Sequence, residues 1–196
     1  MLGSITRLGE RGRGSRWWLT VTAYVVGSAL AGAAVGGSLG GLGSWATAGA
    51  GARLVLLGAV VAIGLALDLG AVGRSLPTVH RQVDEAWRTR YRGWVWGLGY
   101  GVELGIGVVT IVTTSTVYAT WAAALLSGSA SAGAAIGVAF GLSRALPVLS
   151  VARVRRPDQV LRIDAALSRL AAPARRATYA TGAVLASMAI VGGVRS

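Results

Sequence analysis

Long apolar runs separated by short connections constrain the fold of this chain more than any other feature. A helix needs about 20 apolar residues to cross a hydrocarbon core roughly 30 Å thick. Five segments reach or approach that length: residues 17–39, 53–72, 94–126, 130–149 and 177–194. Charged residues make up only 13% of the chain, too few to cover the surface of a soluble domain. The sequence therefore predicts an all-α integral membrane protein, a bundle of five or six transmembrane helices.

Arginines fall in every second connection between these segments. Sixteen of the 19 lie in residues 1–16, 73–93 and 150–176, whereas residues 40–52 and 127–129 carry no charge. The positive-inside rule then predicts a multi-pass protein of the plasma membrane with a cytoplasmic N-terminus. We interpret the net charge of +12 as a topology signal that also favours contact with anionic lipid headgroups, and not as a nucleic-acid surface.

The domain organisation follows from this topology. Residues 1–16 form a basic cytoplasmic N-terminus, and residues 17–196 form a single transmembrane domain. A cleaved signal peptide is the alternative for the first segment, because Ala29-Leu30-Ala31 resembles a cleavage site. Aromatic residues stand at the expected cytoplasmic ends of segments, where their amphipathic rings favour the membrane interface, and they are Trp17, Trp18, Trp94, Trp96 and Tyr179.

Both long basic connections show helical periodicity. Apolar residues recur at helical spacing, and they are Val79, Val83, Trp87 and Tyr91 in the first connection and Val160, Ile163, Leu167 and Leu170 in the second. This pattern predicts two basic amphipathic cytoplasmic segments that lie on the membrane surface. An internal repeat is also indicated, because Gly73-Arg74-Ser75-Leu76-Pro77 matches Ser143-Arg144-Ala145-Leu146-Pro147.

Glycines recur every four residues in three of the apolar segments. The three sets are Gly32, Gly36 and Gly40, then Gly97, Gly101 and Gly105, then Gly133, Gly137 and Gly141. Each set forms one stripe on a helix, and such stripes let helix backbones approach closely in lipid. We expect these glycines to mediate helix packing.

The segment 94–126 is too long for one straight pass, because 33 residues make a helix of roughly 50 Å. Its middle carries the hydroxyl-rich run Thr113-Thr114-Ser115-Thr116. Either the helix is broken near that run, or it is one long helix that tilts or extends past the membrane.

Ionisable residues inside apolar segments are the candidates for a functional site. Glu103, Thr110 and Thr114 would share one face of a continuous helix, and Asp68 and Arg144 lie at a similar expected depth. These five residues are candidates for an ion or substrate site. The alternative is structural pairing, either Glu103 with Arg144 or Asp68 with Arg74.

Several kinds of chemistry find no support in this sequence. The chain has no cysteine, and His80 is its single histidine, so no metal site is expected. No Ser-His-Asp arrangement and no nucleotide-binding loop is present. We therefore predict a protein that is not an enzyme and carries no cofactor.

The run from Gly97 to Pro147 resembles the transmembrane thiol-redox carriers of the CcdA/DsbD type, within the superfamily of LysE-type and sulfite exporters. The features that resemble it are the glycine-rich start Gly97-Leu98-Gly99-Tyr100-Gly101 and the ending Phe140-Gly141-Leu142-Ser143-Arg144-Ala145-Leu146-Pro147. The family's cysteine is replaced here by Thr113-Thr114-Ser115-Thr116, so the chain would be a degenerate member without redox chemistry. The resemblance implies a repeat-built bundle whose broken helix lines a substrate site.

Two functions remain open at this point. The first is a transporter-like or exporter-like protein for an ion or small solute. The alternative is a non-catalytic scaffold or accessory subunit of a membrane complex. Under the alternative, the glycine stripes or the basic helices bind a membrane-protein partner or a second copy of the chain.

Overall fold

The computed structural model describes residues 16–70, 91–107, 114–150 and 157–195, which form helices joined by short connections, with no strand among them. The helices are α2 (Trp17–Gly43), α3 (Ala50–Asp68), α5 (Gly93–Ile106), α6 (Thr116–Leu126), α7 (Ala130–Ala145), α8 (Pro147–Ser150) and α9 (Pro157–Arg195). The predicted all-α architecture is therefore confirmed for the described part of the chain.

Within the described ranges, four stretches are long and apolar enough to cross a membrane. They are Trp17–Gly43, Ala50–Asp68, Ala130–Leu149 and Ala165–Arg195. They overlap four of the five predicted spans. The remaining predicted span, residues 94–126, is not one helix in the structure.

That segment is broken between α5 and α6. Helix α5 ends at Ile106, where Gly107 adopts a φ of 78°, and α6 begins at Thr116. Glycine tolerates this left-handed conformation, which strains residues with a Cβ. A Cβ at Gly107 would also lie 2.8 Å from Cε1 of Phe140. Of the two sequence alternatives, the broken helix is the one that the structure adopts.

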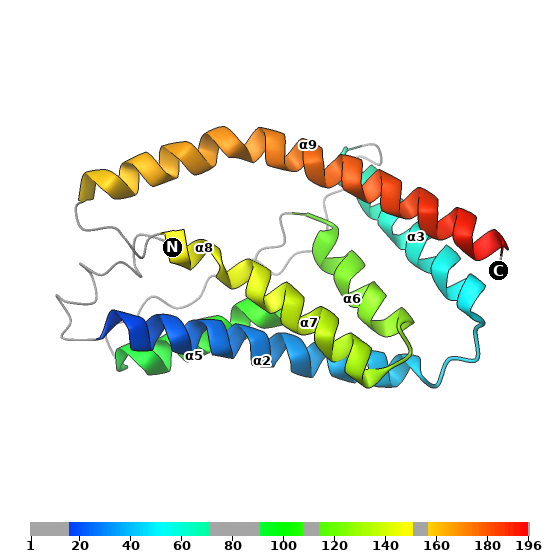
Figure 1. Ribbon diagram of the computed structural model, residues 1–196, viewed down its shortest axis with the longest axis horizontal. Coiled ribbons are helices and arrows are strands. Elements are labelled where there is room, and N and C mark those ends of the chain that lie inside the picture. Colours follow the sequence, from blue (N-terminus) through cyan, green and yellow to red (C-terminus); the bar gives the residue numbers. More distant parts are fainter. Residues whose placement is uncertain (1–15, 71–90, 108–113, 151–156, 196) are drawn as a thin grey trace.

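Helices α2, α5 and α7 form a tightly packed unit, called here the glycine trio (Figure 1). Helix α2 packs along both partners, parallel to α5 and antiparallel to α7, because successive glycines of α5 meet later residues of α2 and those of α7 meet earlier ones. Val21, Trp96 and Val148 form a core cluster at one end of this unit. Trp96 is 1% exposed, so its ring packs inside the protein.

Helices α3 and α9 pair antiparallel at the other side of the molecule, and α6 lies between this pair and the trio (Figure 1). A second core cluster of Val117, Trp121 and Ala124 joins α6 to α2 and α7. The molecule therefore has a glycine-rich side and a looser side that meet at the short helix α6.

Helix α9 differs from the predicted arrangement of a surface helix followed by a span. It is one helix of 39 residues, about 58 Å long, that continues through Pro173. Leu167 and Leu170 are exposed on it, and the side chains of Val160 and Ile163 lie outside the described set. The predicted helical periodicity is therefore present over 157–176, but it continues unbroken into the last span and does not form a separate segment.

Two further predictions concern residues outside the described ranges. The first basic amphipathic segment falls on residues 71–90 apart from Tyr91, which is exposed. The first half of the proposed repeat, residues 73–77, lies there as well. The basic N-terminus, residues 1–15, is likewise outside the description.

Candidate functional site

All nine glycines expected to pack helices lie in the contacts of the glycine trio. Between α2 and α7, a Cβ on Gly32, Gly36 or Gly40 would collide with the carbonyl of Gly137, Gly133 or Ser129, respectively. Between α5 and α2, a Cβ on Gly97 would lie 2.6 Å from the carbonyl oxygen of Thr20. A Cβ on Gly101 or Gly105 would likewise collide with the carbonyl of Tyr24 or Ser28, respectively. Only glycine lets these backbones touch.

Ser28 is a polar residue of this interface that sequence reasoning did not single out. It is fully buried, and its Oγ donates a hydrogen bond of 2.8 Å to the carbonyl oxygen of Gly141. The carbonyl of Ser28 in turn faces the glycine positions 105 and 141. A buried hydroxyl in lipid needs such a partner, and this bond fixes α2 against α7. Ser28 lies four residues before Gly32 and so continues the spacing of that glycine stripe, which is the sequence feature that could have indicated its place in the interface.

Asp68, the last residue of α3, holds the start of α6. Its two carboxylate oxygens accept hydrogen bonds from the backbone N–H of Ser115 at 3.0 and 2.9 Å, and one also accepts from the Ser115 hydroxyl at 2.8 Å. A carboxylate is favourable at a helix N-terminus because the backbone dipoles leave partial positive charge there. Gly64, one turn earlier on α3, makes room, since a Cβ there would lie 2.7 Å from the Cβ of Ser115.

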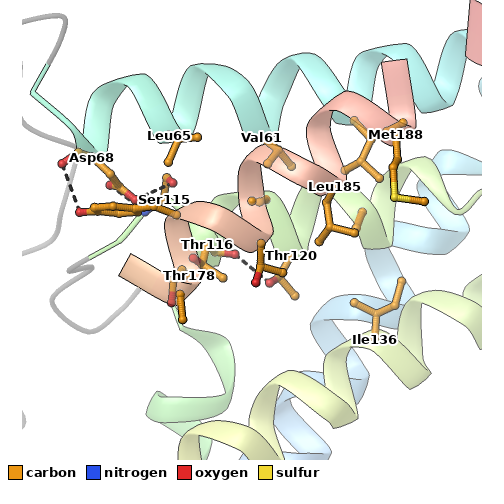
Figure 2. Close-up of a pocket in the computed structure, with 18 of the residues that line it drawn as sticks. Val61, Leu65, Asp68, Ser115, Thr116, Thr120, Ile136, Thr178, Leu185 and Met188 are labelled. Atoms are coloured by element: carbon orange, nitrogen blue, oxygen red, sulfur yellow. Dashed lines mark hydrogen bonds between the residues drawn. The ribbon is translucent and has the colours of Figure 1, made fainter. Parts of the chain in front are cut away.

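A cavity of about 770 Å³ opens beside this carboxylate, between α3, α6 and α9, with Ile136 of α7 at its edge. Figure 2 shows the polar side chains Asp68, Ser115, Thr116 and Thr178 toward one end and Leu185 and Met188 toward the other. Tyr179 of α9 closes the polar end, where its hydroxyl lies 3.4 Å from the backbone oxygen of Asp68. The cavity thus joins a charged end to an apolar body.

A second cavity of about 590 Å³ adjoins the first on the other side of α6, toward α7. Arg144 lies at it, and the guanidinium carbon sits 5.4 Å from the centre of the Phe140 ring. The hydroxyl side chains of Thr114 and Ser143 complete its polar lining. The predicted site residues Asp68, Thr114 and Arg144 are therefore all placed around the start of α6.

Glu103 is not part of this group. It is half-buried on α5 and projects away from α2, because Gly101 and Gly105 face α2 and Glu103 lies between them. The expected alignment with Thr114 on one helix face does not form, since α5 ends at Ile106. Thr110 lies outside the described residues.

Neither predicted ion pair is present in the part of the chain that the structure describes. No ion pair joins Glu103 to Arg144 there, and Arg74, the expected partner of Asp68, falls outside it. Asp68 is instead satisfied by Ser115, a residue that the sequence reasoning treated only as part of a hydroxyl run. Ser115 is the N-cap residue of α6, but its side chain makes no capping hydrogen bond and bonds to Asp68 instead, so the sequence offered no local signal for this contact. The described residues also contain no group of acidic or histidine side chains that could hold a metal ion.

Arg53, near the start of α3, was also missed. Its guanidinium donates hydrogen bonds to the carbonyl oxygens of Ala48 at 3.0 Å and Ala46 at 2.8 Å. It thereby orders the connection between α2 and α3 at the end of the molecule opposite Asp68. An arginine in an otherwise uncharged region was the available signal.

Together these features define a polytopic helical membrane protein with a glycine-packed helix trio, a broken helix and a charged groove around α6. Comparison with known proteins places it more closely. The chain is 33% identical over 191 residues to the "Methylamine utilization protein MauF" of Paracoccus denitrificans, an alignment that covers 94% of this chain and 67% of that protein. The chain belongs to the MauF family.

Other relatives carry the same name. The protein of Methylophilus methylotrophus is 36% identical over 136 residues, which cover 68% of this chain and 48% of that protein. The protein of Paracoccus versutus is 35% identical over 152 residues, or 74% and 56% of the two chains. The chain therefore spans about half the length of these relatives. No family model and no solved structure matches it.

These comparisons correct the resemblance proposed from sequence. The five matching relatives are all named MauF, and none is named as a thiol-redox carrier or an exporter of the LysE or sulfite type. The assignment to the CcdA/DsbD type was wrong, because it rested on the positions of glycines and prolines, which many membrane bundles share. The description as transporter-like finds no support in these names either.

Proposed function

We propose that this protein is a non-catalytic accessory protein of methylamine utilisation that works as a scaffold in the plasma membrane. The observation that carries the proposal is the alignment of nearly the whole chain with the methylamine utilization protein of Paracoccus denitrificans. Of the two functions open from sequence, this is the accessory one. This function requires no transported substrate, no direction of transport and no ion site.

The architecture supports a rigid scaffold rather than a transporter whose helices move against one another. Three of the helices touch backbone to backbone through glycines along two interfaces, so any sliding of α2 against its neighbours would break many contacts at once. Glu103, the residue on which the transport interpretation depended, does not line either cavity around α6. The proposed partners are other membrane proteins of the same pathway.

The same proposal includes the orientation read from the arginines. Residues 1–16, 73–93 and 150–176 face the cytoplasm, and anionic headgroups lie against them. Because the chain has no cysteine, single cysteines can be introduced at positions 46 and 169 and labelled from outside intact cells. Labelling of position 46 alone is expected, and labelling of position 169 alone would reverse the orientation.

A growth and uptake experiment tests the function. The gene is deleted in its own host, and growth with methylamine as nitrogen source is compared with uptake of radiolabelled methylammonium. An accessory protein predicts lost growth on methylamine, normal growth on ammonium and unchanged initial uptake. Loss of uptake together with loss of growth would favour a transporter. Unchanged growth on methylamine would show that the protein is not needed for methylamine utilisation.

A further inference from the structure

The two cavities around α6 are parts of one groove. Both are lined by Thr116, Thr120 and Ile136, so they meet across the exposed stripe of α6 that carries the two threonines. The helices α3 and α9 border the groove on one side and α7 borders it on the other. This surface is called here the α6 groove, and α7 is the member of the glycine trio that borders it.

The polar and apolar parts of the α6 groove are separated along its length. Asp68, Ser115 and Thr116 lie at one end of the first cavity, near the C-terminal end of α3 (Figure 2). Arg144 lines the second cavity near the C-terminal end of α7. Leu54, Leu57, Leu185 and Met188 line the far part. The two cavities measure about 770 and 590 Å³, within or near the range of sites that bind small molecules. A ligand that fits must have a polar head and a long apolar body.

The polar end presents charges of both signs. The Asp68 carboxylate accepts its hydrogen bonds from Ser115 alone among the described residues, and it has no cationic partner there. A carboxylate has about four lone-pair sites, so it can accept a further donor. Arg144 carries five N–H donors in a planar fork that suits phosphate, and the hydroxyls of Thr114 and Ser143 lie at the same cavity.

We propose that the α6 groove binds one molecule of phosphatidylethanolamine. Its phosphate lies at Arg144, its ammonium group donates to Asp68, and its acyl chains run along α3, α6 and α9. The ammonium supplies three N–H donors, which the trimethylammonium of phosphatidylcholine lacks and which phosphatidylglycerol replaces by uncharged hydroxyls. The site therefore distinguishes these headgroups by the charge and the donors that each presents to one carboxylate.

Native mass spectrometry of the delipidated full chain tests the proposal. The protein is mixed in detergent with phosphatidylethanolamine, phosphatidylcholine and phosphatidylglycerol of identical acyl chains. The expected result is a one-to-one adduct of phosphatidylethanolamine that exceeds the other two by about tenfold, the effect of one charge-assisted interaction. Equal adducts of all three lipids would overturn it.

Variants assign the preference to the two charges. Asp68→Asn keeps an oxygen for Ser115 and loses the charge, so phosphatidylethanolamine should fall to the level of phosphatidylcholine. Arg144→Gln should lower binding of all three lipids, because each carries the phosphate. The control Arg53→Gln changes an arginine at the opposite end of α3 and should leave the preference intact. A preference that survives Asp68→Asn would overturn the assignment.

A blocking variant keeps the test independent of these charges. Thr120 lies on the stripe that both cavities share, so Thr120→Trp should fill the groove and remove the adduct while the helix content stays unchanged. An adduct that persists in Thr120→Trp would place the lipid elsewhere. A stable dimer that carries no lipid would mean that a second copy covers the groove, and it would also overturn the proposal.

Discussion

The glycine trio and the α3/α9 pair solve the same packing problem in different ways. In α2, 39% of the most apolar stretch is buried, whereas in α3 and α9 the share is 6%. In the trio, glycines place backbone against backbone over the whole length of the interface. On the other side, Gly58 and Gly193 let α3 and α9 approach closely at two points. Hydrogen bonds that Ser115 donates to the Asp68 carboxylate, and that Tyr179 donates to the Asp68 backbone oxygen, join the elements.

The difference teaches where the molecule is rigid and where it can accept a ligand. Lipid does not drive helices together by the hydrophobic effect, so association depends on close packing and on hydrogen bonds. The helices of the trio pack densely, and neither of the two cavities extends between them. The α3/α9 side uses a few polar contacts, and the cavity between α3, α6 and α9 opens beside them. Substitutions that affect one side should therefore leave the other unchanged.

The largest effect is expected in the trio. Gly137→Leu places a side chain against the carbonyl of Gly32 and 3.2 Å from the backbone nitrogen of Ala33, neither of which can move without shifting α2. We expect a loss of about 3 kcal/mol in the free energy of unfolding, by analogy with overpacked cores. Thermal unfolding in detergent measures it.

Gly192→Leu is the matched control for Gly137→Leu. Gly192 lies in α9, where an added Cβ would meet nothing within 4 Å, so the same substitution should change stability little. Equal losses in both variants would mean that leucine lowers stability for reasons other than contact. An unchanged Gly137→Leu variant would show that α2 and α7 do not touch as described.

The next effect tests the polar contact of the looser side. Asp68→Ala leaves the N–H and hydroxyl of Ser115 without their acceptor, and we expect a loss of about 2 kcal/mol. Asp68→Asn should lose less than half of that, because it keeps one acceptor oxygen. If both variants are as stable as the parent chain, α6 is not held by α3, and the contrast between the two sides would reduce to burial alone.

A smaller effect is expected from the buried hydroxyl of Ser28 inside the trio. Ser28→Ala removes the bond to the carbonyl of Gly141 but keeps the close packing, so the loss should be about 0.6 kcal/mol. Ser187→Ala is the control, since Ser187 is exposed on α9 and bonds only to Ala183 of its own helix. A loss for Ser28→Ala as large as that for Gly137→Leu would mean that hydrogen bonding, and not glycine contact, dominates the trio.

The sequence predicted the elements that depend on one periodic signal. Apolar length located four spans, and glycine spacing located the faces along which α2, α5 and α7 meet, because each signal repeats over several turns. It could not decide whether residues 94–126 were one helix, since the break depends on a single left-handed Gly107 and on its contact with Phe140.

The candidate site was predicted only in part, for a related reason. Asp68 and Arg144 were singled out by their charge in apolar segments, but their partners come from elsewhere in the chain. Ser115 reaches Asp68 across 47 positions of sequence, and no local pattern marks such a contact. Glu103 stood out equally by charge, yet it lies on the far face of α5 once the helix ends at Ile106.

The smallest effect is expected at Glu103. Glu103→Gln keeps the side-chain shape and removes the charge. Within the described residues Glu103 makes no ion pair, and it projects from the side of α5 that does not pack on α2. Stability should therefore change by less than about 0.5 kcal/mol, as for substitutions away from buried networks. A buried partner left without its charge would instead cost about 3 to 5 kcal/mol. The double variant with Arg144→Gln separates the two cases, because independent sites give additive losses within about 0.5 kcal/mol. A coupling well above that value in thermal unfolding would restore the pairing of Glu103 with Arg144, and it would join α5 to the charged end of the α6 groove.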